Sequence, residues 1–218
     1  MKNVMIAAPS YDGTLTVWHA SALSETCKMG LAKDINIYAI YMSYDSLVQR
    51  ARNDIIQLAL EHEVDDLVFI DCDVDWTPED FFKLLEYDVD VVGGIYPKKG
   101  DKEDYPVKAL DGVLKTREDG LVEVEGTATG FLRLTKKAIQ KIWDVSEEYT
   151  ESHKPNPIRM VFDIAIVDGE LVSEDIIFCK KWREMGEKVY LDPSIKLSHV
   201  GTKRWNGDFL SWINKIKT

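Results

Sequence analysis

The chain has 218 residues, of which 45% are hydrophobic and 30% are charged, and this composition excludes a disordered polypeptide. Its 27 basic and 38 acidic side chains leave a net charge of −11. A general nucleic-acid binder is therefore not expected, because phosphate binding draws on clustered lysine and arginine. The three cysteines are far apart and form no C-x-x-C, which argues against a disulfide framework or a structural zinc site.

The first half of the chain alternates between apolar runs and helical patterns. Strands are predicted at residues 4–8, 35–42, 67–70 and 89–95. Helices are predicted from Leu15 to Met29 with an end at Gly30, from Asp45 or Ser46 to His62, and from Pro78 onward. Thr77 before Pro78 suits a helix N-cap followed by the first helical position. This β-α-β order favours a mostly parallel sheet with helices on both faces.

Beyond residue 97 the regular alternation gives way to short mixed strands and turn-rich loops. Strands are predicted at residues 121–124, 131–134, 161–167, 171–172, 189–191 and 195–197, helices at 136–143 and 174–185, and loops at 98–119 and 147–157. Asp168-Gly169 is a strong signal for a two-residue hairpin turn. We therefore expect an α/β fold with a mixed, smaller sheet in the C-terminal half. The change of pattern is not sharp enough to predict a second domain, so residues 1–218 are expected to form one.

The lengths of the apolar runs bear on the cellular location. No run approaches the roughly 18 apolar residues of a membrane span. The apolar run at the N-terminus is too short for a signal peptide. We therefore expect no membrane span and a cytoplasmic location.

The strongest local signal is Asp71-Cys72-Asp73-Val74-Asp75, at the end of an apolar predicted strand. Ligands bind outside the carboxyl ends of strands in open α/β sheets, and two carboxylates there suit a divalent cation such as Mn²⁺ or Mg²⁺. A solvated acidic turn explains the motif alone about equally well. An EF-hand loop does not, because Trp76 and Phe82 stand where glycine and glutamate are needed. A haloacid-dehalogenase phosphatase usually carries its D-x-D on the first strand, whereas this one follows the third.

Arg52 and the Ser173-Glu174-Asp175 run are further candidates on predicted helices. Arg52 can brace a carboxylate or a phosphate, since its guanidinium fork fits oxyanions. The alternative is an exposed helix residue. Glu174 or Asp175 can act as a general base facing a pocket. The alternative is a helix cap, because Ser173 and two acids suit a helix N-terminus.

His199 follows the last predicted strand and is itself followed by Lys203 and Arg204. A neutral imidazole can join two carboxylates on a metal ion, although a lone histidine is more often a packed or exposed residue. The two cations could counter a diphosphate in this otherwise acidic protein. No functional role is expected for His19, His62 or His153. The small-residue run 126–130 allows a close backbone approach to a ligand, and a plain tight turn is an equal alternative.

Taken in order, these motifs resemble the GT-A fold glycosyltransferases, especially small family-2-like enzymes of bacteria, phages and large viruses. The resemblance covers nearly the whole chain, and its elements are Ala8-Pro9-Ser10, Ala51-Arg52-Asn53, Phe69-Ile70-Asp71-Cys72-Asp73, Val92-Gly93-Gly94-Ile95-Tyr96-Pro97, Gly130-Phe131-Leu132, Ser173-Glu174-Asp175 and His199-Val200-Gly201. It implies a Rossmann-like GT-A fold, with residues 1–97 as a nucleotide-binding half and 98–218 as an acceptor-binding half. For a viral or phage enzyme the location would be the host cytoplasm.

The resemblance also implies roles for individual residues. Asp71 and Asp73 would hold a divalent metal ion and the donor ribose, with Asp73 on the metal, and His199 would complete the metal site. Other donor contacts are implied for Pro9, Ser10 and Tyr11 at the base, for Arg52 near the diphosphate, and for Thr129 and Gly130 beside the donor sugar and the acceptor. Asp175 matches the base of inverting members. Asp75 departs from the pattern as a third acid, and the common Q-x-x-R-W is absent.

The predicted function is metal-dependent transfer of a sugar from a nucleoside-diphosphate sugar, with a UDP-sugar favoured, to a carbohydrate or other hydroxyl acceptor. A divalent cation would offset the diphosphate charge that an acidic surface repels. Asp175 would take the acceptor proton, and inversion is favoured over retention. Two alternatives remain: a nucleotidyltransferase or phosphatase with the same metal acids, and a non-catalytic sugar-binding module.

Overall fold

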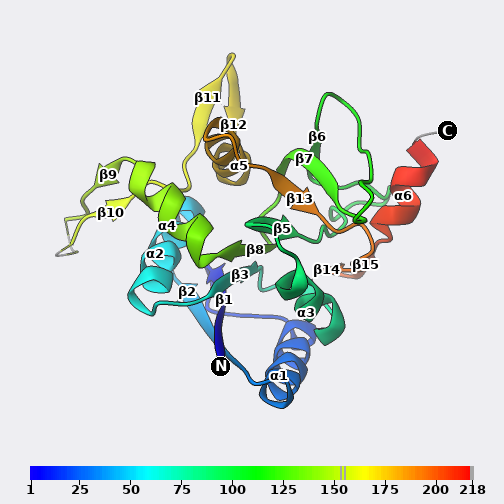
Figure 1. The fold of residues 1–218 in the computed structure, drawn as a ribbon, viewed down its shortest axis with the longest axis horizontal. Coiled ribbons are helices and arrows are strands. Elements are labelled where there is room, and N and C mark those ends of the chain that lie inside the picture. The colour runs from blue at the N-terminus through cyan, green and yellow to red at the C-terminus, as the bar shows by residue number, and fades with distance from the viewer. Residues whose placement is uncertain (153, 155, 217–218) are drawn as a thin grey trace.

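The computed structural model describes residues 1–152, 154 and 156–216. Its main sheet consists of β1 (Lys2–Ser10), β2 (Ile35–Ser43), β3 (Asp66–Ile70), β5 (Val91–Gly93), β6 (Val107–Ala109), β7 (Val122–Thr127), β8 (Phe131–Thr135) and β13 (Val189–Leu191). These strands lie in the order β2-β1-β3-β8-β5-β13-β7-β6 (Figure 1). β7 and β8 run opposite to the others, so the predicted mostly parallel α/β sheet is confirmed. Strands from both halves of the chain share this sheet.

Helices cover the sheet on both faces. They are α1 (Val17–Ala32), α2 (Val48–Glu61), α3 (Pro78–Glu86), α4 (Lys136–Val145) and α5 (Glu174–Glu184). The last helix, α6 (Phe209–Ile216), instead packs its Phe209 ring against Tyr105. α1 packs with α3 and α2 packs with α4, and Figure 1 shows the two pairs on opposite sides of the sheet. Thr77 caps α3 as predicted, because its side chain accepts the Asp80 N–H.

Two predicted helix ends are wrong. α1 continues past Gly30 to Ala32, and Gly30 is buried against β2. A Cβ at residue 30 would lie 2.6 Å from the Ile37 side chain, so the glycine allows close helix-strand packing instead of ending the helix. α2 starts at Val48 rather than beside Asp45, because the Asp45 side chain bonds the Leu47 N–H in the turn before the helix.

Three small sheets complete the architecture. They are β4 (Val74–Asp75) with β14 (Ser198–Val200) and β15 (Arg204–Asn206), β9 (Glu148–Tyr149) with β10 (Ile158–Arg159), and β11 (Ala165–Val167) with β12 (Glu170–Val172). The predicted turn at Asp168-Gly169 joins β11 to β12, and both residues have positive φ, 52° and 84°. The strand predicted at 195–197 lies instead at 198–200, where it pairs with β4.

Arg133 on β8 ties the sheet to the end of α3. Its side chain is 2% exposed, and its guanidinium donates hydrogen bonds to the carbonyl oxygens of Leu84, Tyr87 and Val89. The Asp66 carboxylate lies 3.6 Å from the Arg133 guanidinium and balances its positive charge. The buried guanidinium thus satisfies carbonyl groups at the end of α3 and in the turn that follows it.

Two further observations concern the chain as a whole. Cys27, Cys72 and Cys179 are free thiols. Within the described residues, none of the helices combines the length and the apolar character that crossing a bilayer requires.

Candidate functional site

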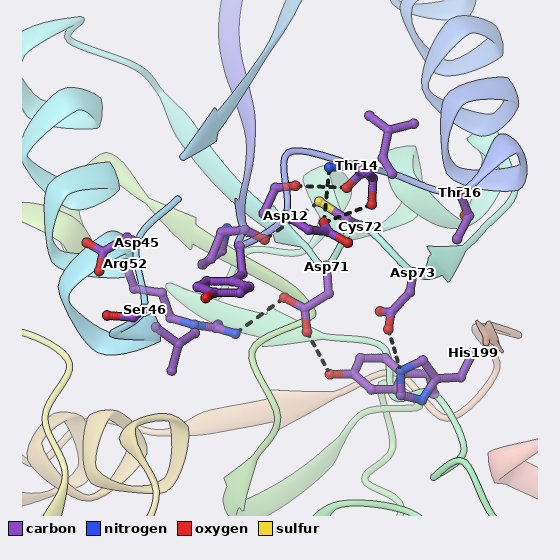
Figure 2. Close-up of a pocket in the computed structure, with 16 residues that line it drawn as sticks. Asp12, Thr14, Thr16, Asp45, Ser46, Arg52, Asp71, Cys72, Asp73 and His199 are labelled. Carbon is purple, nitrogen blue, oxygen red and sulfur yellow. Dashed lines mark hydrogen bonds and ion pairs between the residues drawn. The ribbon is translucent and has the colours of Figure 1, made fainter. Parts of the chain in front are cut away.

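A cleft of about 540 Å³ opens where β1 and β3 end (Figure 2). β1 and β3 are parallel neighbours, so the residues that follow them meet at one edge of the sheet. Of the predicted site residues, the cleft is lined by Pro9, Ser10, Tyr11, Arg52, Asp71, Asp73 and His199. The strand ends therefore bring together residues that lie far apart in the sequence.

One wall of the cleft is the turn after β1. The Ser10 hydroxyl donates to the Thr14 carbonyl at 2.8 Å, and Asp12 accepts hydrogen bonds from the Thr14 N–H and hydroxyl. Tyr11 at the tip of this turn is 69% exposed. The turn is thus held in shape by its own side chains and presents an aromatic ring at the mouth of the cleft.

Asp71 directly follows β3, and its carboxylate is held from two sides. Oδ1 lies 3.3 Å from the Arg52 guanidinium, and Oδ2 accepts a hydrogen bond from the buried Tyr96 hydroxyl at 3.2 Å. Gly130 precedes β8, the antiparallel neighbour of β3, and its carbonyl accepts the Asp71 N–H at 3.1 Å. A Cβ at residue 130 would lie 2.7 Å from Asp71 Cγ and closer still to the Tyr96 oxygen. Only glycine leaves room for this carboxylate.

Asp73 and His199 face each other across the small β4-β14 sheet. His199 pairs with Val74, and the Val200 N–H donates to the Asp73 carbonyl at 2.8 Å. His199 Nε2 consequently lies 3.4 Å from Asp73 Oδ2, as Figure 2 shows. His199 Nδ1 lies 3.0 Å from the Pro97 carbonyl oxygen, which can only accept a hydrogen bond. Nδ1 therefore donates a hydrogen bond to this carbonyl, and this bond fixes the orientation of the ring with Nε2 toward the carboxylate.

The Asp73 carboxylate has a second cationic partner. Lys99 Nζ lies 2.5 Å from Oδ2, the oxygen that also faces His199. Burial raises the pKa of Asp73, but hydrogen bonds from His199 and Lys99 outweigh it and lower the pKa to about 2. The carboxylate is thus ionised at neutral pH and already attracts positive charge.

Arg52 projects from α2 into the cleft and is 5% exposed. Its Nε lies 3.5 Å from a Glu174 oxygen, and its guanidinium carbon lies 5.6 Å from the centre of the Phe69 ring. Within the described part of the chain, Nε and Nη1 are buried without a hydrogen-bond partner. Burial raises the pKa of Glu174 above its ordinary value, and the opposing effect of the Arg52 charge is smaller. The buried guanidinium thus keeps donor capacity that a ligand can use.

Glu174 and Asp175 begin α5, but neither lines the cleft. The Ser173 hydroxyl donates to Asp175 Oδ1 and makes no cap bond to the helix backbone. Asp175 Oδ1 also accepts the Ile176 N–H at 2.8 Å. Ser173 is therefore the N-cap residue of α5, as the alternative interpretation expected, but its hydroxyl is used by Asp175 and not by the helix backbone.

Lys203, Arg204 and Thr129 lie outside the lining of the cleft. The Lys203 ammonium lies 2.8 Å from Asp101, and Arg204 pairs with Asp75. The third acid of the motif is thus engaged by a cation of its own. Thr129 is 1% exposed beside Gly130, and its hydroxyl has no hydrogen-bond partner among the described residues.

His19 has a structural contact that the sequence pattern does not reveal. It is fully buried, with Nδ1 3.1 Å from the Asp71 carbonyl oxygen and Nε2 2.7 Å from the Tyr41 hydroxyl. Burial lowers the pKa of His19, so the ring is neutral and supports the acidic turn from behind. His62 is exposed at the end of α2, and His153 lies outside the described residues.

The donor set offers a divalent cation two protein ligands, and water or a bound substrate would have to supply the others. No group of three or more histidine, cysteine, aspartate or glutamate side chains in the described ranges could hold a metal ion. Asp73 Oδ2 and His199 Nε2 lie close together and could share one metal ion, while Asp71 is occupied by Arg52 and Tyr96. Such a pair suits Mn²⁺ or Mg²⁺, which commonly take one or two protein ligands together with substrate phosphates.

Comparisons with known proteins support the fold. No protein-family model matches the chain, and no curated protein matches it. Among solved structures, A197 from STIV is 20% identical with a TM-score of 0.55, covering 92% of this chain and 86% of that chain. A Drosophila β-1,4-galactosyltransferase 7 mutant, in complex with manganese, UDP-Gal and xylobiose, is 13% identical with a TM-score of 0.54, covering 93% of this chain and 72% of that chain. These likenesses confirm the predicted GT-A-like fold.

Proposed function

We propose that the protein is a metal-dependent glycosyltransferase that moves a sugar from a nucleoside-diphosphate sugar to a hydroxyl acceptor. The observation that carries this proposal is the meeting of Asp73 and His199, 3.4 Å apart, in the same cleft as the Ser10–Thr14 turn and Arg52. A metal-binding pair, a buried guanidinium and an aromatic turn at one sheet edge match the phosphates and base of a nucleotide sugar. A UDP-sugar is favoured, since a GT-A-like neighbour binds UDP-Gal.

Asp73 and His199 are the residues that would hold the cation, with diphosphate oxygens as further ligands. A bound Mn²⁺ or Mg²⁺ would supply positive charge against the departing nucleoside diphosphate. Manganese is present in the galactosyltransferase neighbour, which supports a divalent ion here. Asp75 is not part of the pair, because it lies outside the lining of the cleft and pairs with Arg204 there.

Arg52 and Asp71 would position the donor. The Nη1 group of Arg52, which has no hydrogen-bond partner among the described residues, can donate to an oxyanion that enters the cleft. Asp71 is held by Arg52, Tyr96 and the Gly130 backbone, so its carboxylate accepts donor hydroxyls from a fixed position. Thr129 and Gly130 would border the donor sugar, and the turn at residues 9–11 would hold the base.

Asp175 would remove the proton from the acceptor hydroxyl in an inverting displacement. Glu174 is less suited to this task, because it faces the Arg52 guanidinium at 3.5 Å. Asp175 instead accepts hydrogen bonds from Ser173 and the helix backbone, which hold it in place without neutralising it. A carbohydrate acceptor is favoured, and residues 98–218 would bind it.

The decisive experiment compares Asp73→Asn with Asp75→Asn, two acids of the same turn with different partners. Thermal shifts are measured with UDP-, GDP- and dTDP-sugars, with and without Mn²⁺. We expect one donor with Mn²⁺ to raise the Tm of wild type and of Asp75→Asn. At a hundredfold excess of donor over Kd, binding adds about 2.7 kcal/mol to the free energy of unfolding. Asp73→Asn should lose this shift. The variant should still fold, but with a lower Tm in the absence of ligand, because the charge that His199 and Lys99 stabilise is removed.

The proposal fails if Asp73→Asn binds the donor with Mn²⁺ as wild type does. Release of free phosphate, or uptake of a nucleoside triphosphate, would instead indicate a phosphatase or nucleotidyltransferase. Sugar binding that needs neither metal nor nucleotide would indicate a binding module.

A further inference from the structure

A short segment after β5, residues 96–99, contacts every side chain that was predicted to bind the metal. The contacts are the Tyr96 hydroxyl to Asp71 at 3.2 Å, the Pro97 carbonyl to His199 at 3.0 Å, and the Lys99 ammonium to Asp73 at 2.5 Å. The first two contacts involve buried or backbone groups and fix the geometry of the site. The third contact is made by the long, flexible Lys99 side chain, which is 36% exposed. This ion pair can therefore break without disturbing the fold.

Lys99 stands where a metal ion would have to bind. Its ammonium contacts Asp73 Oδ2, and Nε2 of His199 faces the same oxygen. A divalent cation held by this oxygen and Nε2 would lie within a few ångströms of the ammonium, where like charges repel. The Asp73 carboxylate can therefore pair with Lys99 or bind the metal ion, but it cannot do both while the ammonium stays at this distance.

We propose that Lys99 is the resident counter-ion of this site, which neutralises Asp73 until a divalent cation displaces it and then binds the donor diphosphate. This inference rests on the proposed function, because it assumes a metal ion and a diphosphate in the cleft. A lysine suits the task, since its compact charge on a four-carbon stem can move between a carboxylate and a phosphate.

The neighbouring cations are committed elsewhere. Lys98 pairs with Asp104 at 2.7 Å, Lys203 with Asp101 at 2.8 Å, and Arg204 with Asp75. The sequence suggested that Lys203 and Arg204 counter the charge of the diphosphate. We assign this contact to Lys99 instead, because it lies beside the predicted metal ligand Asp73.

The test uses Lys99→Met, with Lys98→Met as the matched control and Lys99→Arg as the charge-preserving variant. Isothermal titration with MnCl₂ alone, on nucleotide-free protein, should show Mn²⁺ binding about five- to tenfold tighter in Lys99→Met, because a partly exposed competing charge is gone. Titration with UDP at saturating Mn²⁺ should show weaker UDP binding, by a similar factor. Lys98→Met should match wild type in both titrations, and Lys99→Arg should match it with Mn²⁺ alone.

Equal Mn²⁺ affinity in Lys99→Met and wild type would overturn the inference. The proposed function would survive that result if Asp73→Asn still abolished Mn²⁺-dependent donor binding. Adding Asp73→Asn to Lys99→Met must remove the tighter Mn²⁺ binding, and if the gain persists, the ion binds elsewhere and the inference is wrong. The Tm of Lys99→Met without ligand should fall only slightly, by no more than about 4 °C, since the lost ion pair is partly exposed.

Discussion

Replacing Gly130 with alanine tests how tightly the Asp71 carboxylate is positioned. A Cβ at residue 130 would lie 2.7 Å from Asp71 Cγ, whereas ordinary van der Waals contact begins at 3.4 Å. The carboxylate or the backbone must therefore retreat by at least 0.7 Å. The same Cβ also collides with the Tyr96 hydroxyl, which is buried and has little room to move. Asp71 would be pushed away from both Tyr96 and its place beside Arg52.

Two quantities follow from this displacement. Overpacking of a buried site costs about 1–3 kcal/mol, which for a chain of this size lowers Tm by roughly 2–12 °C. A shift approaching 1 Å in a positioning group can reduce the rate or the productive binding by up to about a hundredfold. We therefore expect Gly130→Ala to lose much more donor affinity than its loss of stability alone would cause.

The assay is a melting curve together with titration of UDP in the presence of Mn²⁺. Gly100→Ala is the control, because its Cβ would meet nothing closer than the Lys102 carbonyl oxygen at 3.7 Å. If Gly130→Ala melts and binds UDP as Gly100→Ala does, the carboxylate is not held against the glycine backbone, and the geometry described for Asp71 is wrong.

Two further predictions concern Asp175 and Asp192. Asp175→Asn should leave Tm and donor binding nearly unchanged but reduce sugar transfer by at least about a hundredfold, whereas Ser173→Ala should have a milder effect. Normal transfer by folded Asp175→Asn would make the acid structural. Burial raises the pKa of Asp192, but bonds from Lys83, Ser194 and Tyr87 lower it below its ordinary value. Asp192→Asn should therefore lower Tm at pH 7, by an amount that shrinks below about pH 4 as the wild-type carboxylate protonates. Melting curves that differ equally at pH 7 and pH 3 would contradict this.

The sequence by itself determined the local elements and one edge of the site. Thr77-Pro78 begins α3 and Asp168-Gly169 turns the β11-β12 hairpin, because cap and turn preferences act over a few residues. The position of Asp71 after an apolar strand predicted its place at the edge of the sheet where the cleft opens. Here the chemistry of a short segment is enough to decide its structure.

Only the tertiary structure decided which distant side chains meet. The β4-β14 pairing brings His199 to Asp73, and the insertion of β8 beside β3 places Gly130 against the Asp71 carboxylate. Lys99, rather than Lys203, faces Asp73, because ion pairing depends on where loops end in space and not on their charge alone. Contacts between strands far apart in the chain depend on how the whole core packs, and no short segment carries that information.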